Sequence, residues 1–140
     1  MDKNMLKPLG MVAIISLVLF GIHHFGFSSP AQEAVYSIPA LYLFHFIVTS
    51  VVFVLCSLIA DLLKEQIGLV FLGSVFLKMI LLYLIFKDVF GSEDVEKSIL
   101  IGFVLPYILY LGLEVYLVLN VLKEIDFTKK EDSEIKDETN

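Results

Sequence analysis

The sequence contains no arginine and no tryptophan, and it has one cysteine, Cys56. Without arginine, no side chain offers the planar guanidinium group that binds phosphate in a bidentate way. The formal net charge of −6 also removes the basic surface that a nucleic-acid partner requires. A single cysteine excludes an internal disulfide and any redox or metal site built from paired thiolates. We therefore expect neither nucleic acid as a partner nor cysteine-pair chemistry.

Charged residues are scarce inside four long apolar blocks, at residues 6–27, 38–60, 67–86 and 98–122. Hydrophobic residues make up 58% of the chain, against about 45–50% in soluble domains. A helix that spans a bilayer needs about 20 mostly apolar residues, and blocks of this length without alternation are unlike barrel strands. The sequence predicts an all-α fold: an integral membrane bundle of four transmembrane helices in the lipid bilayer, formed by one domain at 1–125. We expect a multi-pass protein of the cell (inner) membrane.

The segment after the last block is acidic. From Lys123 to Asn140 it holds four lysines and seven acidic residues, with almost no apolar residue after Phe127. Such a segment cannot bury enough apolar surface to offset the entropy lost on ordering. The sequence therefore predicts a disordered acidic tail at 126–140.

Short polar segments connect the blocks. Ser29 and Pro30 are expected to end the first helix and open a loop, and Gly91, Ser92 and Glu93 to form a turn followed by a helix cap. The connection that begins at Asp61 is very short, so the second and third helices are predicted to form a tight antiparallel hairpin.

Lysine placement predicts how the chain is oriented. If the N-terminus is cytoplasmic, seven lysines lie on the cytoplasmic side and two, Lys87 and Lys97, lie outside. This bias favours a topology with both termini in the cytoplasm. An alternative is a cleavable signal peptide with its apolar part at residues 11–20. The apolar stretch continues past Phe20, which favours a retained first helix.

Two charged residues lie deep inside the apolar blocks, Lys78 in the third and Glu114 in the fourth. A lysine at the centre of a membrane helix costs roughly 2.5–3.5 kcal/mol. The nearer helix end is about 12 Å away at 1.5 Å per residue, farther than a lysine side chain reaches by snorkelling. In antiparallel helices the two α-carbons differ in depth by about 8 Å, which two long side chains can bridge. We expect a buried Lys78–Glu114 ion pair.

Other interpretations of Glu114 remain open at this point. Tyr107 and Tyr110 lie on the same helix face and could hydrogen-bond a neutral Glu114 carboxylic acid kept in that form by burial. Alternatively, a Glu114 carboxylate exposed to a path would coordinate an ion or take up a proton.

One face of the second block carries milder polar residues at helical spacing: Tyr42, His45, Thr49 and Cys56. This stripe is expected to face the third helix, with His45 as a hydrogen-bonded packing residue and Cys56 as a small buried one. His23 and His24 are expected at the membrane interface. Three histidines without paired carboxylates give little metal signal, so we expect no metal and no cofactor.

Pro106 interrupts the fourth block. It removes a backbone donor, frees the carbonyl of Gly102 and favours a kink, and Gly102 and Gly112 are expected to allow close helix approach. No nucleophile elbow, phosphate loop, zinc helix motif or dinucleotide fingerprint is present in the sequence. We therefore do not expect an enzyme.

Two segments in the second half of the chain carry a family resemblance: Phe71-Leu72-Gly73-Ser74-Val75-Phe76-Leu77-Lys78, and Pro106-Tyr107-Ile108-Leu109-Tyr110 leading to Glu114. Together they resemble the small four-helix membrane proteins of the ATP synthase protein I type. The most specific element is the lysine inside the third helix. The sequence departs from the family pattern at Glu114, where a neutral polar residue can stand, and in its long acidic tail.

The resemblance implies a non-enzymatic accessory or assembly protein of a rotary ATP synthase membrane sector, with hydrophobic synthase subunits as partners. An unsatisfied Lys78–Glu114 surface would then be a docking site. A second hypothesis is a small cation transporter or channel subunit in which Glu114, Lys78 and His45 line a path. Four helices are few for a transporter, so that function would need a homo-oligomer. A third is a structural or lytic small membrane protein, which needs no charge pair.

Overall fold

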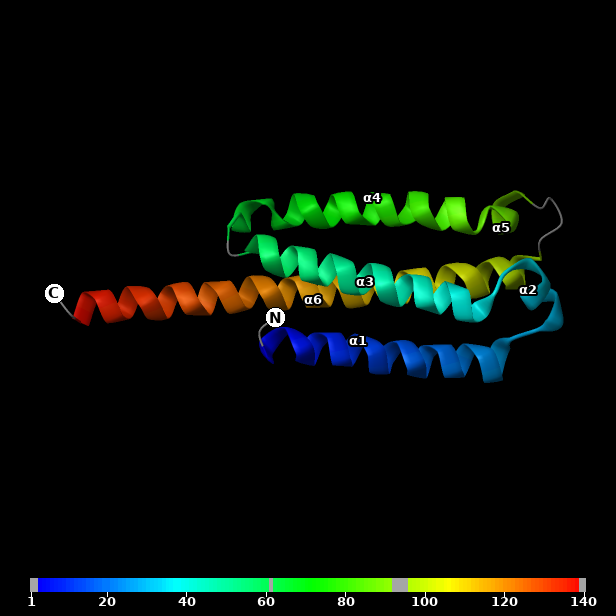
Figure 1. Ribbon diagram of the computed structural model, residues 1–140, viewed down its shortest axis with the longest axis horizontal. Helices are drawn as coiled ribbons and strands as arrows, with labels where there is room; N and C mark the ends of the chain where they lie inside the picture. Colours follow the sequence, from blue (N-terminus) through cyan, green and yellow to red (C-terminus); the bar gives the residue numbers. More distant parts are fainter. Residues whose placement is uncertain (1–2, 61, 92–95, 139–140) are drawn as a thin grey trace.

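The long helices of the protein lie side by side (Figure 1). The computed structural model describes residues 3–60, 62–91 and 96–138, and within these ranges every regular element is helical. Four stretches are long and apolar enough to cross a membrane: Leu6–Phe27, Ile38–Ala60, Ile67–Ile85 and Lys97–Lys123. Their bounds agree with the predicted blocks to within about one residue, so the prediction of an all-α fold with four helices long and apolar enough to span a membrane is confirmed.

The elements follow one another in the order α1 (Lys3–Ile22), η1 (His23–Phe27), α2 (Pro30–Val35), α3 (Ile38–Ala60), η2 (Lys64–Gln66), α4 (Ile67–Ile85), α5 (Lys87–Gly91) and α6 (Lys97–Glu138). Where the sequence predicts a loop after Ser29, the chain forms the short helix α2. Ser29 caps it, because its hydroxyl accepts a hydrogen bond from the Gln32 backbone N–H and Pro30 occupies the first turn. The element η1 is a π-helical continuation of α1.

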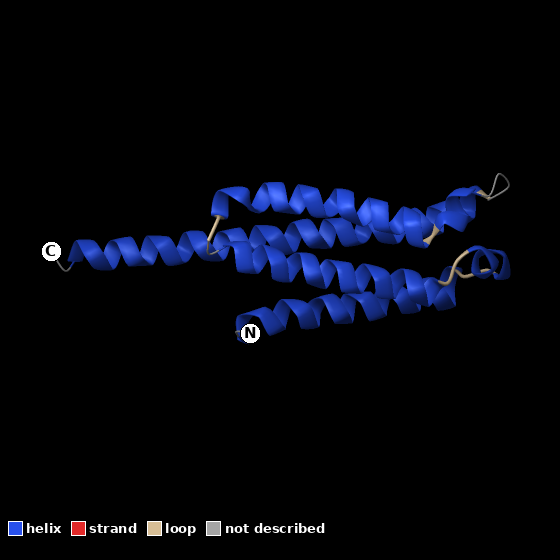
Figure 2. Ribbon diagram, turned by 45° about the horizontal axis from the view of Figure 1, so that its top comes forward, coloured by secondary structure: helices blue, strands red, loops and turns tan. Residues whose placement is uncertain are grey.

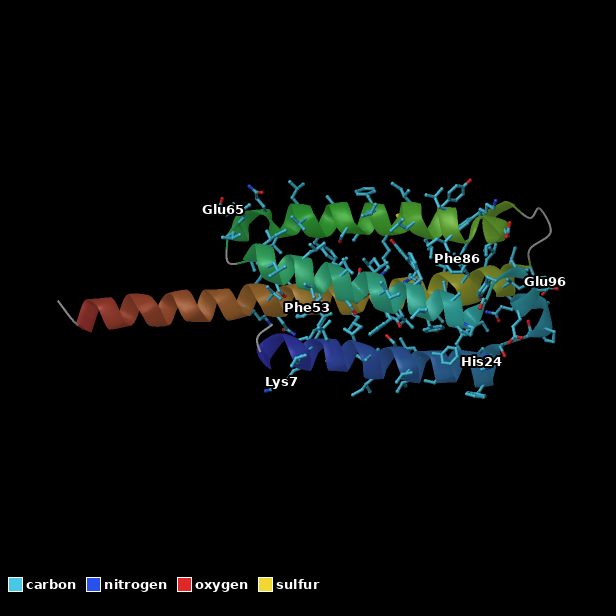
Figure 3. All side chains as sticks on the ribbon, viewed as in Figure 1. Lys7, His24, Phe53, Glu65, Phe86 and Glu96 are labelled. Atoms are coloured by element: carbon cyan, nitrogen blue, oxygen red, sulfur yellow. The ribbon has the colours of Figure 1, made fainter. Side chains whose placement is uncertain are left out.

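At one end of the bundle α1 begins and α6 projects beyond the other helices, and we call it the tail end (Figures 1 and 2). The opposite end contains α2, and we call it the α2 end. Lys7 and Glu65 lie at the tail end, whereas His24 and Glu96 lie at the α2 end (Figure 3).

Helix α3 is the centre of the bundle. It packs against α6, α1 and α4, whereas α4 packs mainly against α3. A core cluster rich in aromatic side chains lies toward the α2 end. Two smaller clusters of mostly aliphatic side chains lie toward the tail end. The second and third spans form the predicted antiparallel hairpin (Figure 1).

Helix α6 is longer than the sequence predicts. It was expected to end near Leu122 and give way to a disordered tail, but the helix continues to Glu138. No proline or glycine follows Gly112, and the lysines and glutamates of this stretch have high helix propensity. The helix is also uninterrupted at Pro106. The predicted helix end at Asp61 and turn at Ser92 and Glu93 lie outside the described residues, as do Thr139 and Asn140.

The two glycines of α6 singled out by the sequence differ in their surroundings. A Cβ atom added at Gly102 would lie 2.8 Å from Nε2 of Gln32, so the glycine leaves room for the polar side chains packed there rather than for the backbone of another helix. A Cβ atom at Gly112 would meet nothing within 4 Å. The prediction of close approach is therefore wrong at Gly112, which lies on an open face of the helix.

Candidate functional site

Lys78 of α4 and Glu114 of α6 meet in the middle of the bundle. The distance from Lys78 Nζ to Glu114 Oε1 is 2.6 Å, and each side chain is 1% exposed. Lys78 lies eleven residues after the start of α4 at Ile67, or about 16 Å at 1.5 Å per residue. Neither charge reaches water, so each stabilises the other in surroundings where a lone charge is costly.

Thr49 of α3 completes the ion pair. Its hydroxyl donates a hydrogen bond of 2.5 Å to Glu114 Oε1 and accepts one of 3.4 Å from Lys78 Nζ. These polar contacts join three helices at one point. These contacts matter most for holding α4 against the bundle, because the buried residues of this helix are Ile67, Lys78 and Leu82.

Two tyrosines of α6 flank the ammonium group. Lys78 Nζ lies 5.9 Å from the ring centroid of Tyr107 and 5.7 Å from that of Tyr110, within the range of cation–π attraction. The hydrogen-bond partners of Glu114 among the described residues are Lys78 and Thr49. The alternative in which a tyrosine hydroxyl serves as the partner of Glu114 is not the arrangement found.

His45 of α3 is fully buried and stacks on Tyr110, with ring centroids 4.9 Å apart and an interplanar angle of 14°. Within the described part of the chain, neither of its ring nitrogens has a hydrogen-bond partner, and the same holds for Glu114 Oε2. Buried polar atoms are seldom left unpaired in native proteins. His45 is thus a packing residue, as expected, but not a hydrogen-bonded one.

The polar stripe of α3 does not face α4 as a whole. Thr49 contacts Lys78, but His45 stacks on α6 and the Tyr42 hydroxyl lies 3.1 Å from Nδ1 of His23 at the end of α1. The prediction that this stripe faces the third helix is therefore wrong for Tyr42 and His45. The reason is the central position of α3, whose buried face is shared among three neighbours.

A second buried polar cluster, which the sequence does not predict, lies at the α2 end. His23 Nε2 lies 2.7 Å from Nε2 of Gln32, and that amide also donates a hydrogen bond to the hydroxyl of Tyr36. Together with Tyr42 these residues join α1, α2 and α3. Burial raises the pKa of the Tyr36 phenol, which therefore keeps its proton at neutral pH.

The His23 side chain is buried within the bundle. Its expected depth at the membrane interface stays a prediction. The wider turn of η1 breaks the spacing of α1 just where His23 occurs, so helical periodicity does not reveal the direction of the ring. His24, by contrast, is partly exposed, with Nδ1 3.7 Å from Oε1 of Glu33. In the sequence, the signal for this cluster is Gln32 in the short α2, whose side-chain amide can serve as a polar partner.

Metal-ligating residues are dispersed in the described part of the chain, where no group of three or more His, Cys, Asp or Glu side chains is placed to hold an ion. Cys56 is a free, buried thiol packed among Val52, Ala60, Ile67 and Val118.

Comparison with curated proteins and with solved structures finds no match. A family described as a family of unknown function, DUF6168, matches residues 1–125. The matched region contains all four spans and both members of the Lys78–Glu114 pair. The chain belongs to the family of unknown function DUF6168.

Proposed function

We propose that the protein is a non-enzymatic accessory or assembly protein of a rotary ATP synthase membrane sector, located in the cell (inner) membrane. The observation that carries this proposal is the ion pair of Lys78 and Glu114, held inside the bundle while the outer helix faces are apolar. The resemblance of the segments around these two residues to the ATP synthase protein I type supplies the class of partner.

The buried pair acts through the position of α4 rather than as a docking surface. With both side chains buried, neither charge is available to a partner, in contrast to the unsatisfied surface considered from the sequence. The pair instead fixes one edge helix whose opposite face is exposed and apolar. The exposed residues of that face include Leu69, Leu72, Phe76, Leu77, Met79, Ile80 and Tyr83.

Helix α4 suits association with other membrane helices. In lipid, such association rests on close packing and polar contacts rather than on the hydrophobic effect. The space around Gly73 is open, so the backbone of another helix can approach there. We place the docking surface for the hydrophobic synthase subunits on this face of α4.

The inner packing favours an accessory role over a path for ions across the whole bundle. Between Glu114 and the tail end, the buried residues among those described are hydrophobic: Val12, Val52, Phe53, Cys56, Ala60, Ile67, Leu117 and Val118. A cation transporter would need polar groups along this half. A purely structural or lytic protein, in turn, would not need a charge pair that costs several kcal/mol to bury.

The proposed orientation places the tail end in the cytoplasm. Lysine bias supports it, and the start of α1 and the end of α6 lie toward the same end of the bundle (Figure 1). In this orientation the acidic extension of α6 projects into the cytoplasm, and α2 and α5 face the outside.

Co-purification tests the proposal. Ring subunits of the synthase should be recovered with the tagged wild-type protein. Leu72→Trp, on the proposed face of α4, should reduce that recovery, whereas Leu105→Trp on α6 should not. The two leucines are both 52% exposed, so the variants are matched in the size of the added side chain and in burial. Normal synthase assembly in a deletion strain would contradict the proposal.

A further inference from the structure

An apolar groove runs along the outside of the bundle between α1 and α3. It has a volume of about 340 Å³, and its lining residues extend from Ala13 to Phe20 on α1 and from Pro39 to Phe46 on α3. Either stretch is about 10 Å long at 1.5 Å per residue. Because the second span begins at Ile38, the groove starts near the α2 end of the membrane region and runs from there toward its middle.

The two hydroxyl groups among the lining side chains are already hydrogen-bonded within the protein. The Ser16 hydroxyl donates to the backbone carbonyl of Val12 at 2.7 Å, and the Tyr42 hydroxyl lies 3.1 Å from Nδ1 of His23. The other lining side chains are hydrocarbon. A ligand that placed a polar group here would leave it without a hydrogen-bond partner, which is costly, so the groove suits a hydrocarbon chain.

The size of the groove excludes a helix as its occupant. Spread over about 10 Å of length, its volume of about 340 Å³ corresponds to a cross-section of about 30 Å². A helix with its side chains is about 10 Å wide and has a cross-section of about 80 Å². A single hydrocarbon chain is much thinner. Leu17 and Leu43 line the groove and are exposed, so a chain can enter sideways from the bilayer.

A polar pair lies beyond the end of the groove that is nearer to α2. His24 stacks on the groove residue Phe20 with ring centroids 5.4 Å apart, and its Nδ1 lies 3.7 Å from Oε1 of Glu33 on α2. Both side chains are partly exposed, and His24 lies at the α2 end of the bundle (Figure 3). An imidazole beside a carboxylate complements a headgroup that carries both a phosphate and an amine.

We propose that this groove binds one acyl chain of a phospholipid from the leaflet at the α2 end, with a headgroup of the phosphatidylethanolamine type at His24 and Glu33. The chain fills space that α1 and α3 leave between them, and its contacts with both helices hold α1 against the bundle. The inference does not depend on the synthase partner, because the docking face proposed above belongs to α4 and the groove does not.

Photolabelling of the full-length protein in liposomes tests the groove. The probe is phosphatidylethanolamine with a diazirine group on one acyl chain, and mass spectrometry locates the labelled residues. Leu43 in the groove should be labelled several-fold more than Ile101 of α6. Their side chains are 59% and 64% exposed, and each lies within about five residues of the α2 end of its span, so the two positions are matched in exposure and depth.

A variant that fills the groove shows whether the labelling depends on it. Ala13→Phe adds a ring to the groove lining and should reduce the label at Leu43 to the level at Ile101. Ala40→Phe is the matched control, because Ala40 is exposed on α3 and lies outside the groove lining, and it should leave the label unchanged. Glu33→Gln tests the headgroup. It should abolish a several-fold preference for phosphatidylethanolamine over phosphatidylglycerol, which has no amine.

Two results would overturn the proposed chain site. One is equal labelling of Leu43 and Ile101, as freely exchanging lipid or a second protein copy over the groove would give. The other is a label at Leu43 that Ala13→Phe leaves unchanged. Equal labelling by the two lipids in the wild-type protein would overturn the headgroup assignment to His24 and Glu33.

Discussion

Thr49 divides α3 into two halves that are packed with different chemistry. On the α2 side, Tyr42 and His45 contact polar or aromatic partners on α1 and α6. On the tail side, Val52 and Cys56 pack against aliphatic side chains. The α2 half holds its helices in fixed geometry by directional contacts, whereas the tail half relies on close packing. A substitution should therefore have effects that depend on the half in which it lies.

The largest loss of stability is expected at the boundary between the halves, where Lys78 and Glu114 form their ion pair. Lys78→Met leaves a buried carboxylate and Glu114→Gln leaves a buried ammonium, and removing one partner of a buried pair costs about 3–5 kcal/mol. The double variant should lose less stability than the sum of the two, with a coupling of roughly 1 kcal/mol or more. Unfolding in mixed detergent measures the cycle. Strictly additive losses would mean that the two residues do not stabilise each other.

A smaller loss of stability is expected at Gly102, where polar side chains of the α2 half fill the space beside the glycine. Gly102→Ala places a Cβ atom 2.8 Å from Gln32 Nε2, so the Gln32–His23 contact must shift, at a cost of about 1–3 kcal/mol. Gly112→Ala is the control on the same helix. It meets nothing within 4 Å and should be neutral or stabilise α6 by up to about 1 kcal/mol. Equal losses in unfolding experiments on both variants would show that the α2 half is not specially constrained.

A buried polar atom should lower the stability of the protein more in the tail half of the bundle than in the α2 half. Val52→Thr keeps the shape of a buried side chain, 4% exposed, but places a hydroxyl in an apolar cluster, which costs about 1–3 kcal/mol without a partner. A bond back to the preceding helical turn brings this toward the lower end. A neutral Val52→Thr in the same unfolding assay would argue that water already reaches this half.

The smallest effect is expected beyond the bundle. Truncation after Phe127 removes most of the acidic stretch, which projects past the other helices (Figure 1). Membrane insertion and yield should be unchanged, because the bundle keeps all four spans. Quantitative immunoblotting of the membrane fraction measures this, and a collapse in yield would show that the projecting segment stabilises the membrane domain.

The four spans could be predicted from sequence because long apolar runs have no other stable form in lipid. The meeting of Lys78 and Glu114 followed from the cost of a buried charge and from the rise per residue. The His23–Gln32 cluster could not be predicted in this way, because it combines a π-helical turn with a short helix outside the spans. Hydrophobic periodicity describes regular helices, and it contains no information about either of these elements.

The helical extension of α6 has a mechanical consequence. Glu114 and Glu138 belong to the same unbroken helix, and 24 residues at 1.5 Å each separate them by about 36 Å. With its pivot where the span ends, at Lys123, the helix has nine residues to Glu114 on one side and fifteen to Glu138 on the other. A tilt of α6 that moves the ion pair therefore displaces the far end about 1.7 times as far, so a partner that binds there would sense the state of the membrane core.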